Sequence, residues 1–63
     1  MDQAVLVVRW CVRLENGIVE GMVSLATVQH YVFAAAVMLE YTNTALADRC
    51  WRALEIYAAS GTA

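Results

Sequence analysis

The sequence contains no lysine and no proline. Without lysine, the chain cannot form a Schiff base with a carbonyl substrate, and it cannot provide the lysine of a Walker-type phosphate-binding loop. All of its positive charge comes from four arginines, which stand against six acidic residues and leave a formal net charge of −2. Because phosphate binding relies on clustered cations that release counterions, this balance argues against a nucleic-acid-binding protein. An alanine- and valine-rich chain with arginine as its only cation also indicates a GC-rich genome, bacterial or phage.

Charged residues are scarce, at 16% of a 63-residue chain in which 62% of the residues are hydrophobic. Globular proteins are usually ~45–50% apolar and ~25% charged. A chain this short forms one domain at most, residues 1–63, and buries only about 60% of the surface that its unfolded form exposes. The surplus of apolar side chains must therefore be covered by a second copy of the chain, by another protein or by a membrane.

Metal-ligating residues are few, with two cysteines and one histidine. Cys11 and Cys50 lack the short spacing of zinc sites, so no metal and no cofactor is predicted. The first residues also lack the basic region, apolar stretch and small-residue cleavage site of a secretory signal. We therefore expect a cytoplasmic protein with reduced thiols.

His30 is the obvious candidate for a general base, because histidine fills that role most often. Catalysis would also require an orienting acid and a nucleophile within hydrogen-bond reach. Neither the hydroxyls of Ser24 and Thr27 nor the two thiols form a recognisable arrangement with it in the sequence. No catalytic residue is predicted, and a non-enzymatic function is expected.

Residues 5–25 favour a β-hairpin. The first half of this segment is rich in valine, and it ends at Asn16-Gly17, the strongest short-range hairpin signal. With these two residues as the turn, one face of the hairpin is wholly apolar, and Arg13 lies opposite Glu20 on the solvent side. A shift of register by one residue would destroy both features.

A helix over residues 3–15, ended by Asn16-Gly17, is the competing interpretation. Four valines and Trp10 disfavour it, since β-branched and aromatic side chains lose conformational freedom in a helix. The sequence therefore predicts an α+β fold, in which the hairpin precedes two helices or one kinked helix. An all-α helical hairpin is the alternative.

Two helices are predicted after the hairpin. The first, over 28–41 with Thr27 as its cap, contains an unbroken apolar run over 31–39 and is apolar on nearly every side, as in a buried helix. The second, over 44–59, has polar and apolar residues on opposite sides and follows three residues that favour caps and turns.

The predicted function follows from the 28–41 helix, because a chain of this size cannot surround it. We expect a small protein–protein interaction or regulatory protein that acts as a homo-oligomer, with a dimer favoured, or as a subunit of a larger assembly. A small membrane protein and a dimeric nucleic-acid-binding regulator are the alternatives; residues 21–39 carry no formal charge, but Gln29 and His30 would lie near the middle of a membrane span. The predicted interface residues are Val32, Phe33, Ala35, Ala36, Val37 and Met38.

The arginines form two short clusters, each next to a tryptophan and a cysteine: Arg9 with Arg13, and Arg49 with Arg52. Brought together in the fold, these guanidinium groups would make an anion-binding site, because arginine binds carboxylates and phosphates with two hydrogen bonds and stacks on aromatic rings. The simpler interpretation is that each arginine pairs with a nearby acid, as Arg13 would with Glu20.

Overall fold

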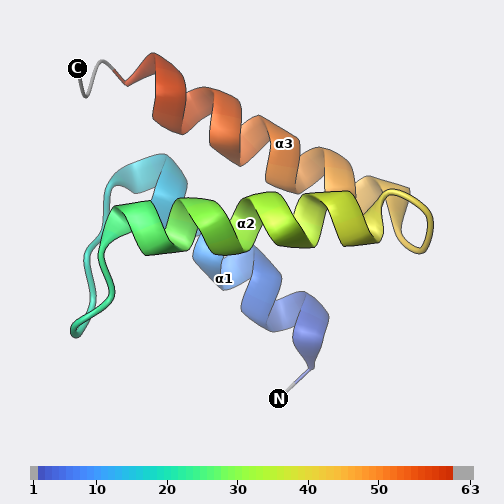
Figure 1. Ribbon diagram of the computed structural model, residues 1–63, viewed down its shortest axis with the longest axis horizontal. Coiled ribbons are helices and arrows are strands. Elements are labelled where there is room, and N and C mark those ends of the chain that lie inside the picture. Colours follow the sequence, from blue (N-terminus) through green and yellow to red (C-terminus); the bar gives the residue numbers. More distant parts are fainter. Residues whose placement is uncertain (1, 61–63) are drawn as a thin grey trace.

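The computed structural model describes residues 2–60, and in this range the chain consists of three helices and no strand (Figure 1). The helices are α1 (Gln3–Asn16), α2 (Leu25–Leu39) and α3 (Thr44–Ala59), and each packs against the other two. The predicted α+β fold with a β-hairpin over 5–25 is therefore wrong, whereas the all-α alternative fits.

Helix α1 occupies the segment that was predicted to be the first strand. The carboxylate of Asp2 caps it by accepting a hydrogen bond from the backbone N–H of Ala4 at 3.1 Å. Val7, Cys11 and Leu14 recur at helical spacing, and all three are buried. The valine-rich segment thus contains buried residues at helical spacing. The strand prediction overlooked this spacing because it considered only the alternation of apolar and polar residues.

Asn16-Gly17 ends α1 instead of turning a hairpin. Gly17 has a left-handed backbone, with φ of 65°, and its N–H donates to the carbonyl of Arg13. The side-chain amide of Asn16 donates to the carbonyl of Val12 at 2.9 Å. A glycine at positive φ serves a helix C-terminus as well as a type I′ turn, so this signal does not separate the two structures.

Replacing Gly17 with alanine is expected to lower the free energy of unfolding by about 1 kcal/mol, because a Cβ is strained in the left-handed region. No atom lies within 4 Å of the position that this Cβ would take, so the loss comes from the backbone alone. Urea denaturation measures it, and Gly17→Asn, which tolerates positive φ better, should lose less. Equal stability of wild type and Gly17→Ala would contradict the observed helix end.

The other two helices begin at side-chain caps. The hydroxyl of Ser24 accepts from the N–H of Thr27 at 3.2 Å, so α2 begins at Leu25, earlier than the predicted start at residue 28. The side chain of Asn43 caps α3 in the same way. The chain leaves the helical path between Leu39 and Thr44, which makes α2 and α3 two helices and not one kinked helix.

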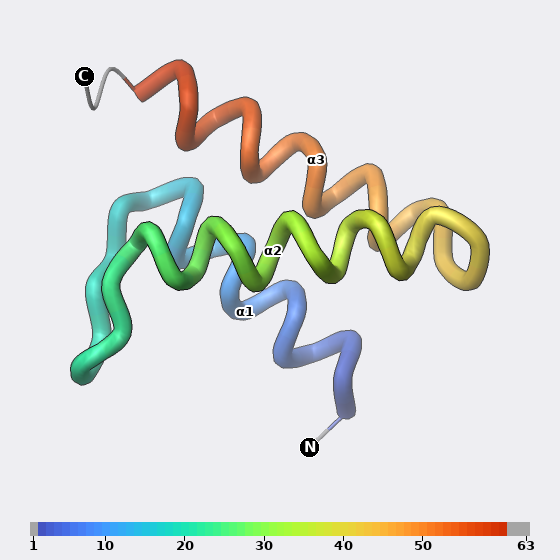
Figure 2. Tube along the Cα trace, viewed as in Figure 1, coloured from blue at the N-terminus to red at the C-terminus, as the bar shows by residue number. Residues whose placement is uncertain are grey.

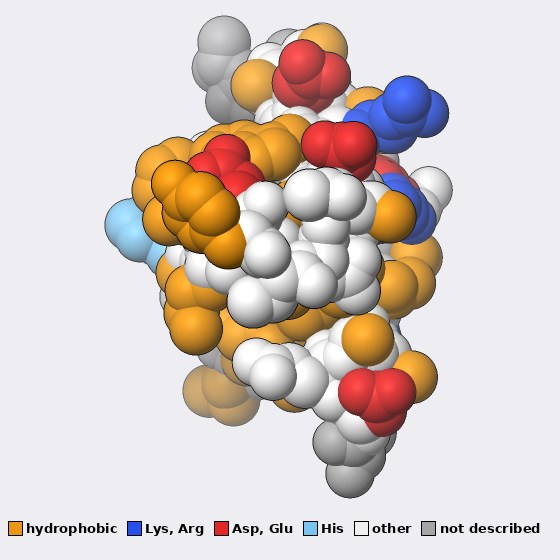
Figure 3. All heavy atoms as spheres, turned by 90° about the vertical axis from the view of Figure 1, so that its right-hand side faces the viewer, with side chains coloured by type: hydrophobic (Ala, Val, Ile, Leu, Met, Phe, Trp, Pro, Cys, Tyr) orange, Lys and Arg blue, Asp and Glu red, His pale blue; other side chains and the backbone are white. Residues whose placement is uncertain are grey.

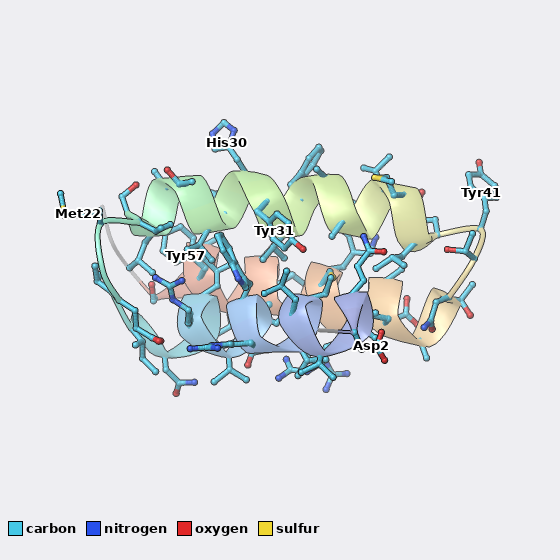
Figure 4. The ribbon with its side chains drawn as sticks, turned by 90° about the horizontal axis from the view of Figure 1, so that it is seen from below. Asp2, Met22, His30, Tyr31, Tyr41 and Tyr57 are labelled. Atoms are coloured by element: carbon cyan, nitrogen blue, oxygen red, sulfur yellow. The ribbon has the colours of Figure 1, made fainter. Side chains whose placement is uncertain are left out.

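The helices form two layers, with α2 lying across α1 and α3 (Figure 4). The trace in Figure 2 shows α2 running opposite to α3. The core between the layers is made of small and medium-sized side chains. Its buried apolar residues are Val7, Cys11, Leu14, Val28, Val32, Ala36, Ala47, Cys50 and Ala53.

Aromatic pairs join α2 to each helix of the other layer. Trp10 of α1 lies against Tyr31 of α2, with ring centroids 4.5 Å apart, and Tyr31 points from α2 toward α1 in Figure 4. Phe33 of α2 meets Trp51 of α3 edge to face, with centroids 5.5 Å apart. Such pairs add about 0.5–1.5 kcal/mol beyond the area that they bury, so they strengthen both contacts of α2.

Candidate functional site

Part of α2 that α1 and α3 leave uncovered is apolar and open to solvent. Its residues lie three or four positions apart and so form one continuous strip along the helix. The exposed fractions are 53% for Phe33, 44% for Val37 and 70% for Met38. We call this strip the α2 outer face; its residues are Phe33, Ala34, Val37 and Met38 of α2, together with Tyr41 in the turn that follows the helix.

The surface view shows how this strip relates to the charges. In Figure 3, hydrophobic side chains gather on the side that carries the histidine, whereas the arginines visible in that view lie on the other side. His30 itself points away from α1 and α3 (Figure 4). The molecule thus has an apolar side, formed by α2, that is distinct from the side where its cations lie.

A shallow groove adjoins the α2 outer face where α2 passes α3. It has a volume of about 360 Å³ and is lined by Gln29, His30, Phe33 and Leu54. The edge-to-face contact with Trp51 fixes the ring of Phe33, which is one wall of the groove. One wall of the groove is therefore an aromatic ring that packs against α3 and is also open to solvent.

The structure divides the six predicted interface residues between the surface and the core. Phe33, Val37 and Met38 are exposed, whereas Val32 and Ala36 are fully buried within the chain itself. The sixth, Ala35, is half-buried and packs against the core. Ala34 and Tyr41 are exposed but are not among these six, and half-buried Leu54 of α3 lines the groove; because α2 is apolar on nearly every side, hydrophobicity alone does not indicate which side faces outward.

Arg13 lies in the interior and not on the solvent side as the hairpin predicted. Its side chain is 7% exposed, and its guanidinium carbon lies 5.3 Å from the ring centroid of Trp10. One guanidinium nitrogen donates to the backbone carbonyl of Glu20 at 3.2 Å. The carboxylate of Glu20 lies instead 3.7 Å from Arg9, in a pair too exposed to contribute much. Arg13 therefore holds the segment between α1 and α2 against α1.

The second arginine cluster contains one ion pair between two helices. Arg49 of α3 forms an ion pair with Glu15 of α1, and the side chain of Glu15 is largely shielded from solvent. Arg49 and Arg52 also line a shallow depression together with Asp48. Because Arg9, Arg13 and Arg49 all contact groups of their own chain, the geometry favours the structural interpretation of the arginines over an anion-binding site.

The two cysteines meet in the core. Their sulfur atoms lie 3.8 Å apart, and neither side chain is exposed. Burial, helped by the neighbouring thiol, raises the pKa of Cys11 to about 12, and burial also raises the pKa of Cys50. Since the thiolate is the reactive form, burial suppresses the reactivity of both thiols while the chain is folded. Among residues 2–60, no three His, Cys, Asp or Glu side chains are grouped so as to hold a metal ion.

The membrane-protein alternative concerns residues 21–39, which include the whole of α2. In the part of the chain that the structure describes, no helix is both long enough and apolar enough to cross a bilayer. Comparisons with protein-family models, with curated proteins and with solved structures found no match to this chain. The interpretation of the candidate site therefore depends on the geometry of the chain's own residues.

Proposed function

We propose that this protein is a small non-enzymatic interaction protein that acts as a homodimer, in which the α2 outer face of one copy packs against that of the other. The supporting observation is the strip of exposed apolar side chains on α2, where Phe33, Val37 and Met38 are each about half exposed or more. Large contiguous apolar patches on small globular proteins mark interaction sites. A partner that covers this strip removes the surplus of apolar surface evident in the composition.

A second copy of the chain suits this face for two reasons. The strip from Phe33 to Met38 carries no charge, so two copies bring no like charges together at its centre. Closed two-fold symmetry is the commonest arrangement of homo-oligomers. An antiparallel pairing whose two-fold axis passes at the level of residue 35 sets the two helix dipoles in opposition and places Phe33 of one copy beside Val37 of the other. The small side chain of Ala34 lets the two backbones approach.

The area needed for a stable dimer is modest. Burying ~600 Å² of apolar surface per chain, or ~1,200 Å² in the pair, at ~25 cal/mol per Å² gives a gross gain of about 30 kcal/mol for the dimer. The loss of translational and rotational freedom offsets an estimated 4–15 kcal/mol of that gain. The net affinity therefore depends on how well the centre of the strip packs, which makes single substitutions there informative.

We expect Val37→Glu to weaken the dimer by at least ~100-fold in Kd, because two-fold symmetry buries two unpaired carboxylates for each substitution. Sedimentation equilibrium at micromolar concentration should give the mass of two chains for wild type and of one chain for Val37→Glu. Val8→Glu is the matched control: Val8 is 38% exposed against 44% for Val37, but it lies on α1. This control should remain dimeric.

Circular dichroism shows whether each variant keeps its helices. A wild-type particle with the mass of one chain throughout the micromolar range would refute the homodimer. Equal dissociation of Val37→Glu and Val8→Glu would refute the assignment of the interface to α2.

A further inference from the structure

Cys11 and Cys50 are the only cysteines of the chain, and the fold brings them into contact. They come from α1 and α3, are 39 residues apart in the sequence, and have sulfur atoms 3.8 Å apart. A disulfide requires a sulfur–sulfur distance of about 2.05 Å. The sulfurs must therefore approach by less than ~2 Å for the bond to form.

We propose that Cys11 and Cys50 form an intramolecular disulfide under oxidising conditions, and that this bond fastens α1 to α3. The proposal concerns the core and is independent of the α2 outer face. The disulfide would have a large effect on the stability of this chain, because a single core of small side chains stabilises a short chain only weakly. A bond between residues so far apart in the sequence restricts most of the unfolded chain.

The reaction needs an oxidant, which we take to be a low-molecular-weight disulfide such as oxidised glutathione. One cysteine thiolate attacks a sulfur of oxidised glutathione, which forms a mixed disulfide and releases one glutathione thiolate. The second cysteine thiolate attacks the protein sulfur of that mixed disulfide and releases the other. The two cysteines lose two electrons and two protons, and one oxidised glutathione becomes two reduced ones.

Burial determines when this exchange takes place. In the folded chain both thiols are inaccessible, and with a pKa of about 12 roughly one Cys11 in 10⁵ is a thiolate at pH 7. Exchange therefore proceeds during folding or through transient opening of the helices. The same shielding protects the finished disulfide from reductants, so the redox state changes only while the chain is unfolded or its helices are transiently open.

The test is a redox titration of the full chain. The chain is refolded in glutathione buffers of increasing ratio of reduced to oxidised glutathione, quenched with acid, and analysed by intact mass for the loss of two hydrogens. The same titration in guanidinium chloride gives the ratio of reduced to oxidised glutathione at which the unfolded chain forms the disulfide. We expect the native chain to keep its disulfide at a ratio at least ~10-fold more reducing than the unfolded chain does, because the fold holds the thiols together.

A matched variant moves one thiol by one helical turn. Cys50→Ala combined with Ala53→Cys exchanges two fully buried residues of α3 and leaves the composition of the core unchanged. The disulfide of this variant should be reduced at the same ratio of reduced to oxidised glutathione as the disulfide of the unfolded wild type. Oxidised wild type should also melt at least ~10 °C above the reduced form.

Two results would overturn the proposal. Equal titration midpoints for the native and the unfolded wild type would show that the fold does not favour the bond, whether or not the variant folds. Disulfides that join two chains, or adducts with glutathione in place of an internal bond, would show that the native sulfurs do not reach each other.

Discussion

Leu14→Ala is expected to lower the free energy of unfolding by about 3 kcal/mol, within the range for leucine-to-alanine changes in a core. Leu14 is 1% exposed and is the largest of the fully buried side chains. It lies in the last turn of α1, and the other fully buried core residues are valine, cysteine and alanine, whose short side chains can extend little into the space that it leaves. Because small domains are stable by only about 5–15 kcal/mol, this variant should unfold at a much lower urea concentration.

Urea denaturation followed by circular dichroism measures the loss. Ile56→Ala on α3 removes a similar number of atoms from a side chain that is 41% exposed, and it should cost less than ~1 kcal/mol. Comparable losses for the two variants would contradict the burial of Leu14 between the helices.

Alkaline pH is expected to destabilise the reduced protein strongly. Burial raises the pKa of Cys11 from its ordinary value of 9.0 to about 12, so between these values the folded chain keeps a proton that the unfolded chain has released. The contribution of Cys11 to the free energy of unfolding is fully present below pH 9. It is lost as the pH rises toward 12, and the loss is up to ~1.4 kcal/mol per pH unit. The raised pKa of Cys50 acts in the same direction.

The control is the double variant Cys11→Ala and Cys50→Ala, which retains every tyrosine and arginine. Stability is measured by urea denaturation at a series of pH values from neutral to alkaline, with a phosphine reductant present. Wild type should lose stability above pH 9 more steeply than the double variant. Parallel profiles would mean that the thiols are accessible to water in the folded chain.

The error over α1 arose because local sequence supports two structures equally well. Valine loses only tenths of a kcal/mol in a helix relative to good helix formers. Burying a side chain such as Val7 or Leu14 gains about 1.5–3 kcal/mol, which outweighs that preference. The surfaces that bury them belong to α2 and α3, which the first sixteen residues do not reveal. Asn16-Gly17, finally, ends a helix as readily as it turns a hairpin.

The candidate site was only partly predictable for a related reason. The helical segments after residue 24 were predictable because helical spacing is a local feature that a sequence displays directly, although the cap of α2 is Ser24 and not the predicted Thr27. The outward side of α2 depends instead on how the three helices pack. Arg13 is a second case: its partner is the backbone carbonyl of Glu20, and a backbone partner leaves no trace in the pattern of side chains.

The aromatic pairs allow the two contacts of α2 to be observed separately. Trp10 with Tyr31 reports on the packing of α2 against α1, and Trp51 with Phe33 reports on its packing against α3. A variant that keeps a single tryptophan therefore emits from one helix contact alone. Fluorescence transitions that coincide in the two single-tryptophan variants would mean that the layers separate in one cooperative step. Transitions that differ would identify the helix that leaves first.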